Sequence, residues 1–401
     1  TTSRRRPPRC ATAPPAPRAD QLSALRGLPA DAVARGRAFH AALRPGTYAS
    51  LGIGLVAALL FGLTSLGSRT VELCGRPFGG HWLAQALLGG LVVVLAGEVA
   101  VLPLVSWQHA VVRRYGLSTQ SWAGWATDLA KGYAVGAVIG AVVLVVFFTV
   151  TRFLPRGWWV VCAAGAAAMV VLFTFVFPLL VEPIFNRFTP MEPGPLRDDL
   201  VAMAARDGVP VRDVLVADAS RRTTAVNAYV SGIGPTRRIV VYDTLLTEAP
   251  PAEVVSVVAH ELGHAKRGDV LTGTLLGALG AAASVVVLYL LGGWGRLLRA
   301  ARVESIVEPR AIGLLLAVVA LVGLAGGPVQ ALVSRRVEAR ADLHALTLTN
   351  DPTTFAAMQA RLTTVNLGDP DPPRLEHLLL ASHPSAVERI AAAMAWARTA
   401  R

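Results

Sequence analysis

Charged residues are scarce in this sequence. Only 16% of its 401 residues are Asp, Glu, Lys or Arg, whereas 53% are hydrophobic. A typical soluble domain carries about 25% charged residues. The shortage excludes an intrinsically disordered chain and argues against a purely soluble enzyme.

Cysteine and a recognisable export signal are also lacking. Cys10, Cys74 and Cys162 form no CxxC pair, which argues against a disulfide framework and against a thiolate metal site. Residues 1–20 are rich in arginine and proline but are not followed directly by an apolar core, so they do not resemble a signal peptide. We expect a basic N-terminal arm over residues 1–45, with its first part, residues 1–20, disordered.

Hydrophobic residues gather in six long runs. Each run is long enough to cross a bilayer as a helix, which takes about 20 residues. The runs lie between Arg44 and Arg69, from 82 to 107, between Lys131 and Arg152, between Arg156 and Glu182, from 270 to 295 and from 311 to 334. Glu98 is a carboxylate within the second run, and either a functional role or a water-facing position near a helix end would explain it.

The polar segments between the runs indicate the orientation of the chain. With six spans, the N-terminal arm and residues 108–131, 183–269 and 335–401 lie on one side of the membrane, and they carry most of the Lys and Arg residues. The positive-inside rule places this side in the cytoplasm. We therefore predict four transmembrane helices in 46–182 and two in 270–334, with polar blocks at 183–269 and 335–401. The net charge of +12 follows from this topology, and we expect no nucleic-acid partner because no basic stripe is interleaved with aromatic residues.

The first polar block contains an HExxH motif, His260-Glu261-Leu262-Gly263-His264. On a helix the two histidines share one face and can bind a single metal ion. Glu261 lies beside them and can accept the proton of metal-bound water. The two imidazoles suit Zn²⁺, so we predict one zinc ion per chain. Pro251 and Gly268 stand where this helix is expected to begin and end.

A catalytic zinc needs a third protein ligand and an open fourth position. Glu338 is the best candidate, and Asp342 follows it by one helical turn, where it could orient a ligand imidazole. A charged helix that merely anchors the sixth span is the alternative interpretation. His264 precedes the fifth span and Glu338 follows the sixth, so both emerge on the same side, within ~10 Å of the membrane surface if the helices continue.

Two further segments could complete the site. Residues 227–230 and 238–242 flank a turn-rich segment and predict a β-hairpin, which could pair with an extended peptide or simply pack on the metal helix. Asn227 could bind a substrate carbonyl or be a plain turn residue. His383 and Arg389 could stabilise a developing oxyanion if the C-terminal segment folds back over the metal; otherwise they cap the final helix.

These segments together resemble the type I CAAX prenyl proteases, which are integral-membrane zinc metalloendopeptidases. The matching segments are YGLSTQ at 115–120, EPIFNRF at 182–188, NAYVSG at 227–232, HELGH at 260–264, EARAD at 338–342 and HPSAVER at 383–389. They occur in the family's order over most of the chain. The Ala- and Arg-rich composition is typical of a high-GC bacterium, so the resemblance points to a bacterial member in the plasma membrane.

The resemblance implies an all-α membrane protein, a multi-span helical barrel around a water-filled chamber, with a zincin-like (gluzincin) catalytic domain that contains a small sheet. It implies that His260, His264 and Glu338 bind zinc and that Glu261 is the general base. It also implies that Asn227, His383 and Arg389 hold the substrate and stabilise the transition state. The substrate would be a peptide or protein, lipidated or membrane-associated.

The sequence departs from the eukaryotic pattern in three places. Six spans are present where that family has seven, Asp269 replaces a histidine, and Ser385 replaces a proline. Two other functions remain open at this point. One is a quality-control membrane metalloprotease of the heat-shock type. The other is a non-catalytic membrane scaffold or transporter with a structural metal, which the intact Glu261 disfavours.

Overall fold

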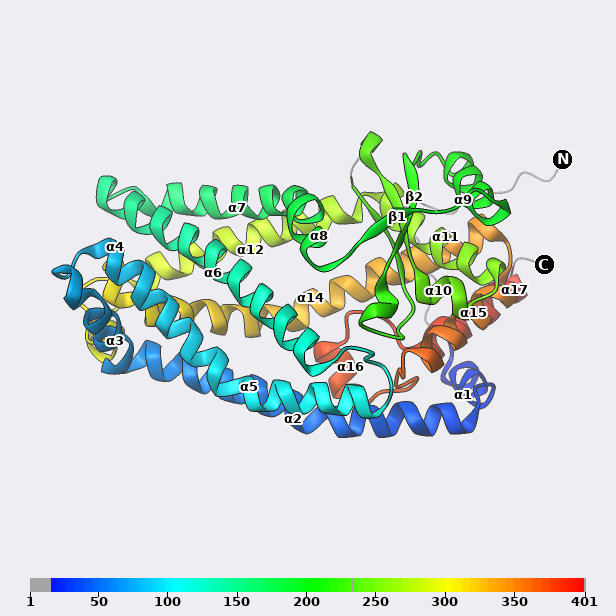
Figure 1. Ribbon diagram of the computed structural model, residues 1–401, viewed down its shortest axis with the longest axis horizontal. Coiled ribbons are helices and arrows are strands. Elements are labelled where there is room, and N and C mark those ends of the chain that lie inside the picture. Colours follow the sequence, from blue (N-terminus) through cyan, green and yellow to red (C-terminus); the bar gives the residue numbers. More distant parts are fainter. Residues whose placement is uncertain (1–15, 233, 400–401) are drawn as a thin grey trace.

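The computed structural model describes residues 16–399, apart from residue 233. Residues 1–15 of the expected disordered segment lie outside the described residues, whereas its last residues, from Arg18 on, begin helix α1 (Arg18–Arg26). The molecule is elongated (Figure 1), with long helices along most of its length and a small sheet with short helices at one end. The helical membrane fold with a small sheet is confirmed.

Among the described residues, six helices are long and apolar enough to cross a membrane, as the sequence predicts. They are α2 (Ala30–Leu63), α5 (Gly90–Arg114), α6 (Trp122–Phe153), α7 (Trp158–Val176), α12 (Asp269–Leu291) and α14 (Ile312–Thr349). The fifth run of the sequence thus becomes α12, and α14 continues well beyond the sixth run. Side chains such as Val138, Leu279 and Leu290 are 64–68% exposed, which suits helices surrounded by lipid.

The six long helices form a closed ring. Along the ring, α2 contacts α5, α5 contacts α6, α6 contacts α7, α7 contacts α12, α12 contacts α14, and α14 returns to α2. Short elements cover the end far from the sheet, namely α3 (Ser65–Gly75), α4 (Trp82–Ala84) and α13 (Gly295–Ala301). This ring is the helical barrel that the resemblance to the CAAX prenyl proteases implies.

The sheet has four strands in the order β1-β2-β4-β3. β1 (Phe188–Pro190) pairs antiparallel with β2 (Asp213–Ala217), β2 pairs parallel with β4 (Arg238–Tyr242), and β3 (Ala228–Ser231) pairs antiparallel with β4. The predicted hairpin is therefore β3 and β4, with Asn227 just before the strand. The pattern did not predict β1 and β2, because their partners lie across longer connections without a local turn signal.

Short helices surround the sheet and continue the chain to its end. They are α8 (Glu182–Phe185), α9 (Pro195–Arg206), α10 (Asp243–Glu248), α11 (Pro251–Arg267), α15 (Pro352–Val365), α16 (Arg374–Leu380) and α17 (Ala386–Thr399). The main core of this region joins residues of α9, the sheet, α11, α14 and α15. On its other side α17 packs against α1 (Arg18–Arg26), where Val387 and Ile390 meet Ala24. The C-terminal segment thus folds back against α11 and α14.

Glycines allow α2 and α14 to approach closely. A Cβ atom added at Gly313 would lie 2.3 Å from the Phe61 carbonyl oxygen, and one added at Gly62 would lie 2.4 Å from the Ala317 Cβ. Small residues at such contacts allow membrane helices to pack tightly.

We therefore predict that Gly313→Ala destabilises the protein by about 1–3 kcal/mol, because backbone must move to relieve the clash. The readout is the thermal midpoint in detergent. Gly323→Ala on the same helix is the matched control, since nothing lies within 4 Å of its added Cβ. Equal midpoints for the two variants would contradict the close approach.

Candidate metal centre

Helix α11 carries the HExxH motif. Pro251 begins the helix, and Gly268 ends it in the left-handed conformation at φ 67°. Val254, Val258 and Leu262 are fully buried on one side and fix the rotation of the helix against the core. This rotation leaves His260 and His264, one turn apart, on the face toward α14.

Helix α14 crosses α11 at Gly263. A Cβ atom added there would lie 3.0 Å from the Cβ of His344 on α14, so glycine permits the close approach. Asp207, buried after α9, holds both helices by contacting Lys266 of α11 at 2.5 Å and His344 at 2.9 Å. Glu338, two turns before His344 on α14, is thereby brought to the histidines.

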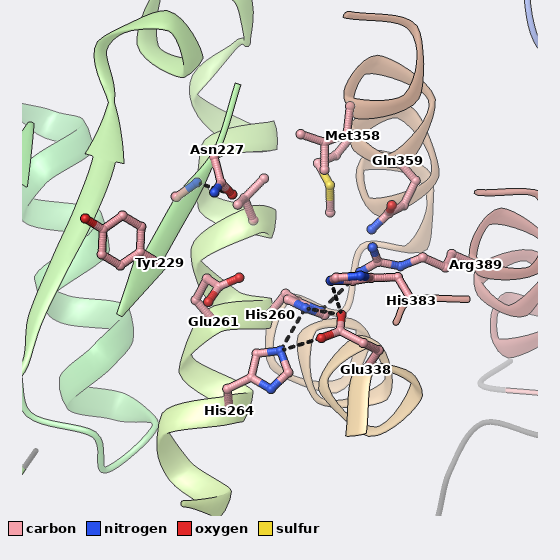
Figure 2. A pocket seen from close by; sticks show the side chains of 13 residues that line it. Asn227, Tyr229, His260, Glu261, His264, Glu338, Met358, Gln359, His383 and Arg389 are labelled. Carbon is pink, nitrogen blue, oxygen red and sulfur yellow. Dashed lines mark hydrogen bonds and ion pairs between the residues drawn. The ribbon is translucent and has the colours of Figure 1, made fainter. Parts of the chain in front are cut away.

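Three candidate metal-binding side chains converge at this crossing. Figure 2 shows His260, His264 and Glu338 directed toward one another. The two Nε2 atoms are 3.1 Å apart, and Glu338 oxygens lie 3.3 Å from His260 Nε2 and 3.5 Å from His264 Nε2. His260 and Glu338 are buried.

The far nitrogens of both rings face carboxylates. His260 Nδ1 lies 2.9 Å from Asp342, and His264 Nδ1 lies 3.0 Å from Asp269. When each Nδ1 donates to its carboxylate, both Nε2 lone pairs point into the same space. Two facing lone pairs beside a carboxylate need a cation between them, so the donor set fits a metal ion.

The electrostatics of the cluster also favour positive charge. Burial alone would lower the pKa of His260, but Asp342 and Glu338 outweigh it and raise the pKa to about 9. Each orienting carboxylate is itself held by an arginine. Arg389 of α17 forms a bidentate pair with Asp342, and Arg340 lies 3.2 Å from Asp269.

Asp269 is a site residue that the sequence reasoning did not select. It was noted only as a departure from the eukaryotic pattern, yet it orients His264 from the first residue of α12. The available signal was its position directly after Gly268, five residues beyond His264 and at the start of the next helix.

Glu261 lies beside the ligands and lines the same cavity. Burial raises the pKa of its carboxyl, and the two neighbouring imidazoles offset this only in part. A carboxyl with a raised pKa is better matched to accepting and returning a proton near neutral pH.

The cavity over the ligands has a volume of about 320 Å³ and brings together all the expected site residues except Asp342, which lies behind His260. Asn227 accepts the Ala228 N–H at 2.9 Å from its place before β3. His383 is 59% exposed and its Nε2 lies 3.5 Å from Glu338. Glu98 of α5 does not line this cavity; its side chain instead hydrogen-bonds Tyr133 of α6.

Comparisons with known proteins identify the family of this chain. Residues 191–397 match the model of peptidase family M48, and residues 43–187 match the CAAX prenyl protease N-terminal model, described as five membrane helices. The fold and the site define a membrane metallopeptidase. The chain belongs to peptidase family M48, since that model covers more than half of it.

Individual relatives share different parts of the chain. The uncharacterized metalloprotease YhfN of Bacillus subtilis is 29% identical over 75% of this chain and 71% of its own length. CAAX prenyl protease 1 of Saccharomyces cerevisiae is 31% identical, but over only 42% of this chain and 38% of its own length. The crystal structure of S. mikatae Ste24p has the same fold, with a TM-score of 0.82 at 21% identity over 94% of this chain and 96% of that chain.

The orienting role of Asp269 can be tested by metal titration. We expect Asp269→Ala to weaken metal binding by about 10–100-fold, because His264 loses the partner that fixes its ring. Asp371→Ala is the control, since Asp371 pairs with Arg18 on α1. Affinities measured with a competing chelator should separate the two variants, and equal affinities would argue against the role of Asp269.

Proposed function

We propose that this protein is a zinc-dependent endopeptidase that cleaves peptide bonds close to the membrane surface. The observation that carries the proposal is the pair of Nε2 atoms held toward each other beside Glu338. A set of two imidazoles and one carboxylate suits Zn²⁺ with one open position. We assign His260, His264 and Glu338 as its ligands, with one ion per chain.

The reaction divides among the residues around the ion. When bound, zinc supplies a Lewis acid that polarises the peptide carbonyl and acidifies water. Glu261 accepts the proton of the attacking water and returns it to the leaving amine. His383, exposed to the cavity, donates to the developing oxyanion. Arg389 is held by Asp342 and so also fixes the orientation of His260, while Asn227 contacts the substrate backbone.

Two units of the chain carry different tasks in this proposal. Residues 46–182 and 270–334 form the membrane unit, and residues 183–269 and 335–401 form the catalytic unit. The charge distribution supports a cytoplasmic catalytic side in a bacterial plasma membrane. The substrate is then a peptide or protein at the cytoplasmic face, lipidated or otherwise membrane-associated, in keeping with the names of the eukaryotic relatives.

A scaffold or transporter with a structural metal is less well supported. A structural site closes all four positions with protein ligands, whereas here three ligands face a cavity that also holds Glu261. Quality control of damaged membrane proteins uses the same chemistry and differs only in substrate.

The role of Glu261 can be tested by substitution. Glu261→Gln keeps the shape of the side chain but cannot accept a proton, so we expect peptide cleavage to fall by about 10²–10⁴-fold while zinc content stays near one ion per chain. Zinc is measured by elemental analysis and cleavage with a quenched fluorescent peptide. Glu304→Gln, in the loop after α13, makes the same chemical change as a control. Unchanged cleavage by Glu261→Gln would overturn the mechanism.

The substrate class can be tested by competition between three substrates. A farnesylated C-terminal peptide, the same peptide without its lipid and an unfolded membrane protein are offered to the purified enzyme. We expect the lipidated peptide to have the highest kcat/KM because the site lies at the membrane surface. Preference for the unfolded protein would favour quality control instead.

A further inference from the structure

A second cavity adjoins the catalytic one. Its volume is about 540 Å³, within the range of about 300–1,000 Å³ that is usual for ligand pockets. The two cavities share Gln359, Leu362, His383 and Arg389 in their walls. A chain that leaves the metal site past His383 would therefore enter this second cavity.

Gln359 of α15 presents an unpartnered donor in the wall between the cavities. Its side chain is only 3% exposed, and its Nε2 has no hydrogen-bond partner among the described residues. Figure 2 shows the amide directed toward His383 and Arg389. A buried amide without an acceptor is unfavourable unless a ligand or water provides one. Its place in the cavity wall lets a substrate provide that oxygen.

His377 of α16 presents the complementary group. Its Nε2 lies 3.2 Å from the Glu388 carboxylate, and its buried Nδ1 has no partner among the described residues. When Nε2 donates to Glu388, Nδ1 keeps its lone pair and can accept a hydrogen bond. Arg335 donates to the carbonyl oxygens of His377 and Ala381 at 2.8 and 2.6 Å, so α16 is anchored in place.

Gln359 and His377 both line the second cavity, and their unpartnered donor and acceptor match the C=O and N–H groups of an extended peptide. We propose that this second cavity is a subsite for the part of the substrate that continues beyond the scissile bond. Gln359 donates to a substrate oxygen, and His377 accepts from a substrate N–H. The inference rests on the proposed peptidase function and adds where the flanking peptide binds.

The test compares peptides of increasing length on either side of the cleaved bond, each with a free and an amidated C-terminus. Gln359→Leu removes the amide but keeps the size of the side chain. For peptides that reach the cavity, we expect KM to rise roughly 3- to 10-fold, with kcat nearly unchanged. The shortest cleaved peptides should show no difference. The thermal midpoint should stay equal or rise, because a buried unpaired amide is lost.

Two further variants complete the design. His377→Gln retains a donor for Glu388 but loses Nδ1, so it should raise KM for the same long peptides. Gln21→Leu on α1 makes the matched chemical change away from both cavities and should leave KM unaltered. A rise confined to free-acid peptides identifies the oxygen as a terminal carboxylate, and a rise in both forms identifies a backbone carbonyl; both support the subsite.

Other outcomes would overturn the proposed subsite. A KM for long peptides that is the same in Gln359→Leu and the unaltered protein, or a rise that is equal at every length, rules out the subsite while leaving the peptidase function intact. A lowered thermal midpoint with unchanged KM would assign Gln359 a packing role. Absence of cleavage by the unaltered protein would instead refute the proposed function itself.

Discussion

The close crossing of α11 and α14 is the contact on which the site depends. Gly263 lets the Cβ of His344 approach, and Asp207 ties His344 to Lys266 of α11. These contacts set the separation of Glu338 from the two histidines. A larger side chain at Gly263 would push the helices apart and move Glu338 away from the two histidines. Gly263 therefore affects the geometry of the site although it does not line the cavity.

Carboxylates are concentrated around this crossing, and arginines that lie farther from the imidazoles neutralise two of them. Glu338, Asp342 and Asp269 surround the imidazoles, while Arg389 and Arg340 neutralise the outer two carboxylates. Buried carboxylates are costly unless they are paired and hydrogen-bonded. The arginines come from α17 and α14, so the return of the C-terminal segment serves the stability of the centre as well as its catalytic cavity.

The sequence predicted much of this arrangement because some signals are local. Long apolar runs predict membrane helices. HELGH at 260–264 and EARAD at 338–342 predict two helix faces that can bind the same metal ion. The residues alone left the roles of Asn227, His383 and Arg389 open, because their distance from the metal site depends on how the chain returns; the resemblance then suggested those roles. β1, β2 and Gln359 carried no usable local pattern, because their roles arise from contacts across the fold, such as the parallel pairing of β2 with β4.

The closed ring of helices has a consequence for biogenesis. The site gathers residues from 227 to 389, and α12 and the membrane-spanning part of α14 lie between His264 and Glu338 in the chain. During synthesis, therefore, the two histidines emerge well before Glu338, the proposed third ligand. A nascent chain whose last hairpin has not yet entered the bilayer carries only part of the centre. Under the proposed assignment, the complete set of three metal-binding side chains can therefore come together only after the last membrane hairpin has been made.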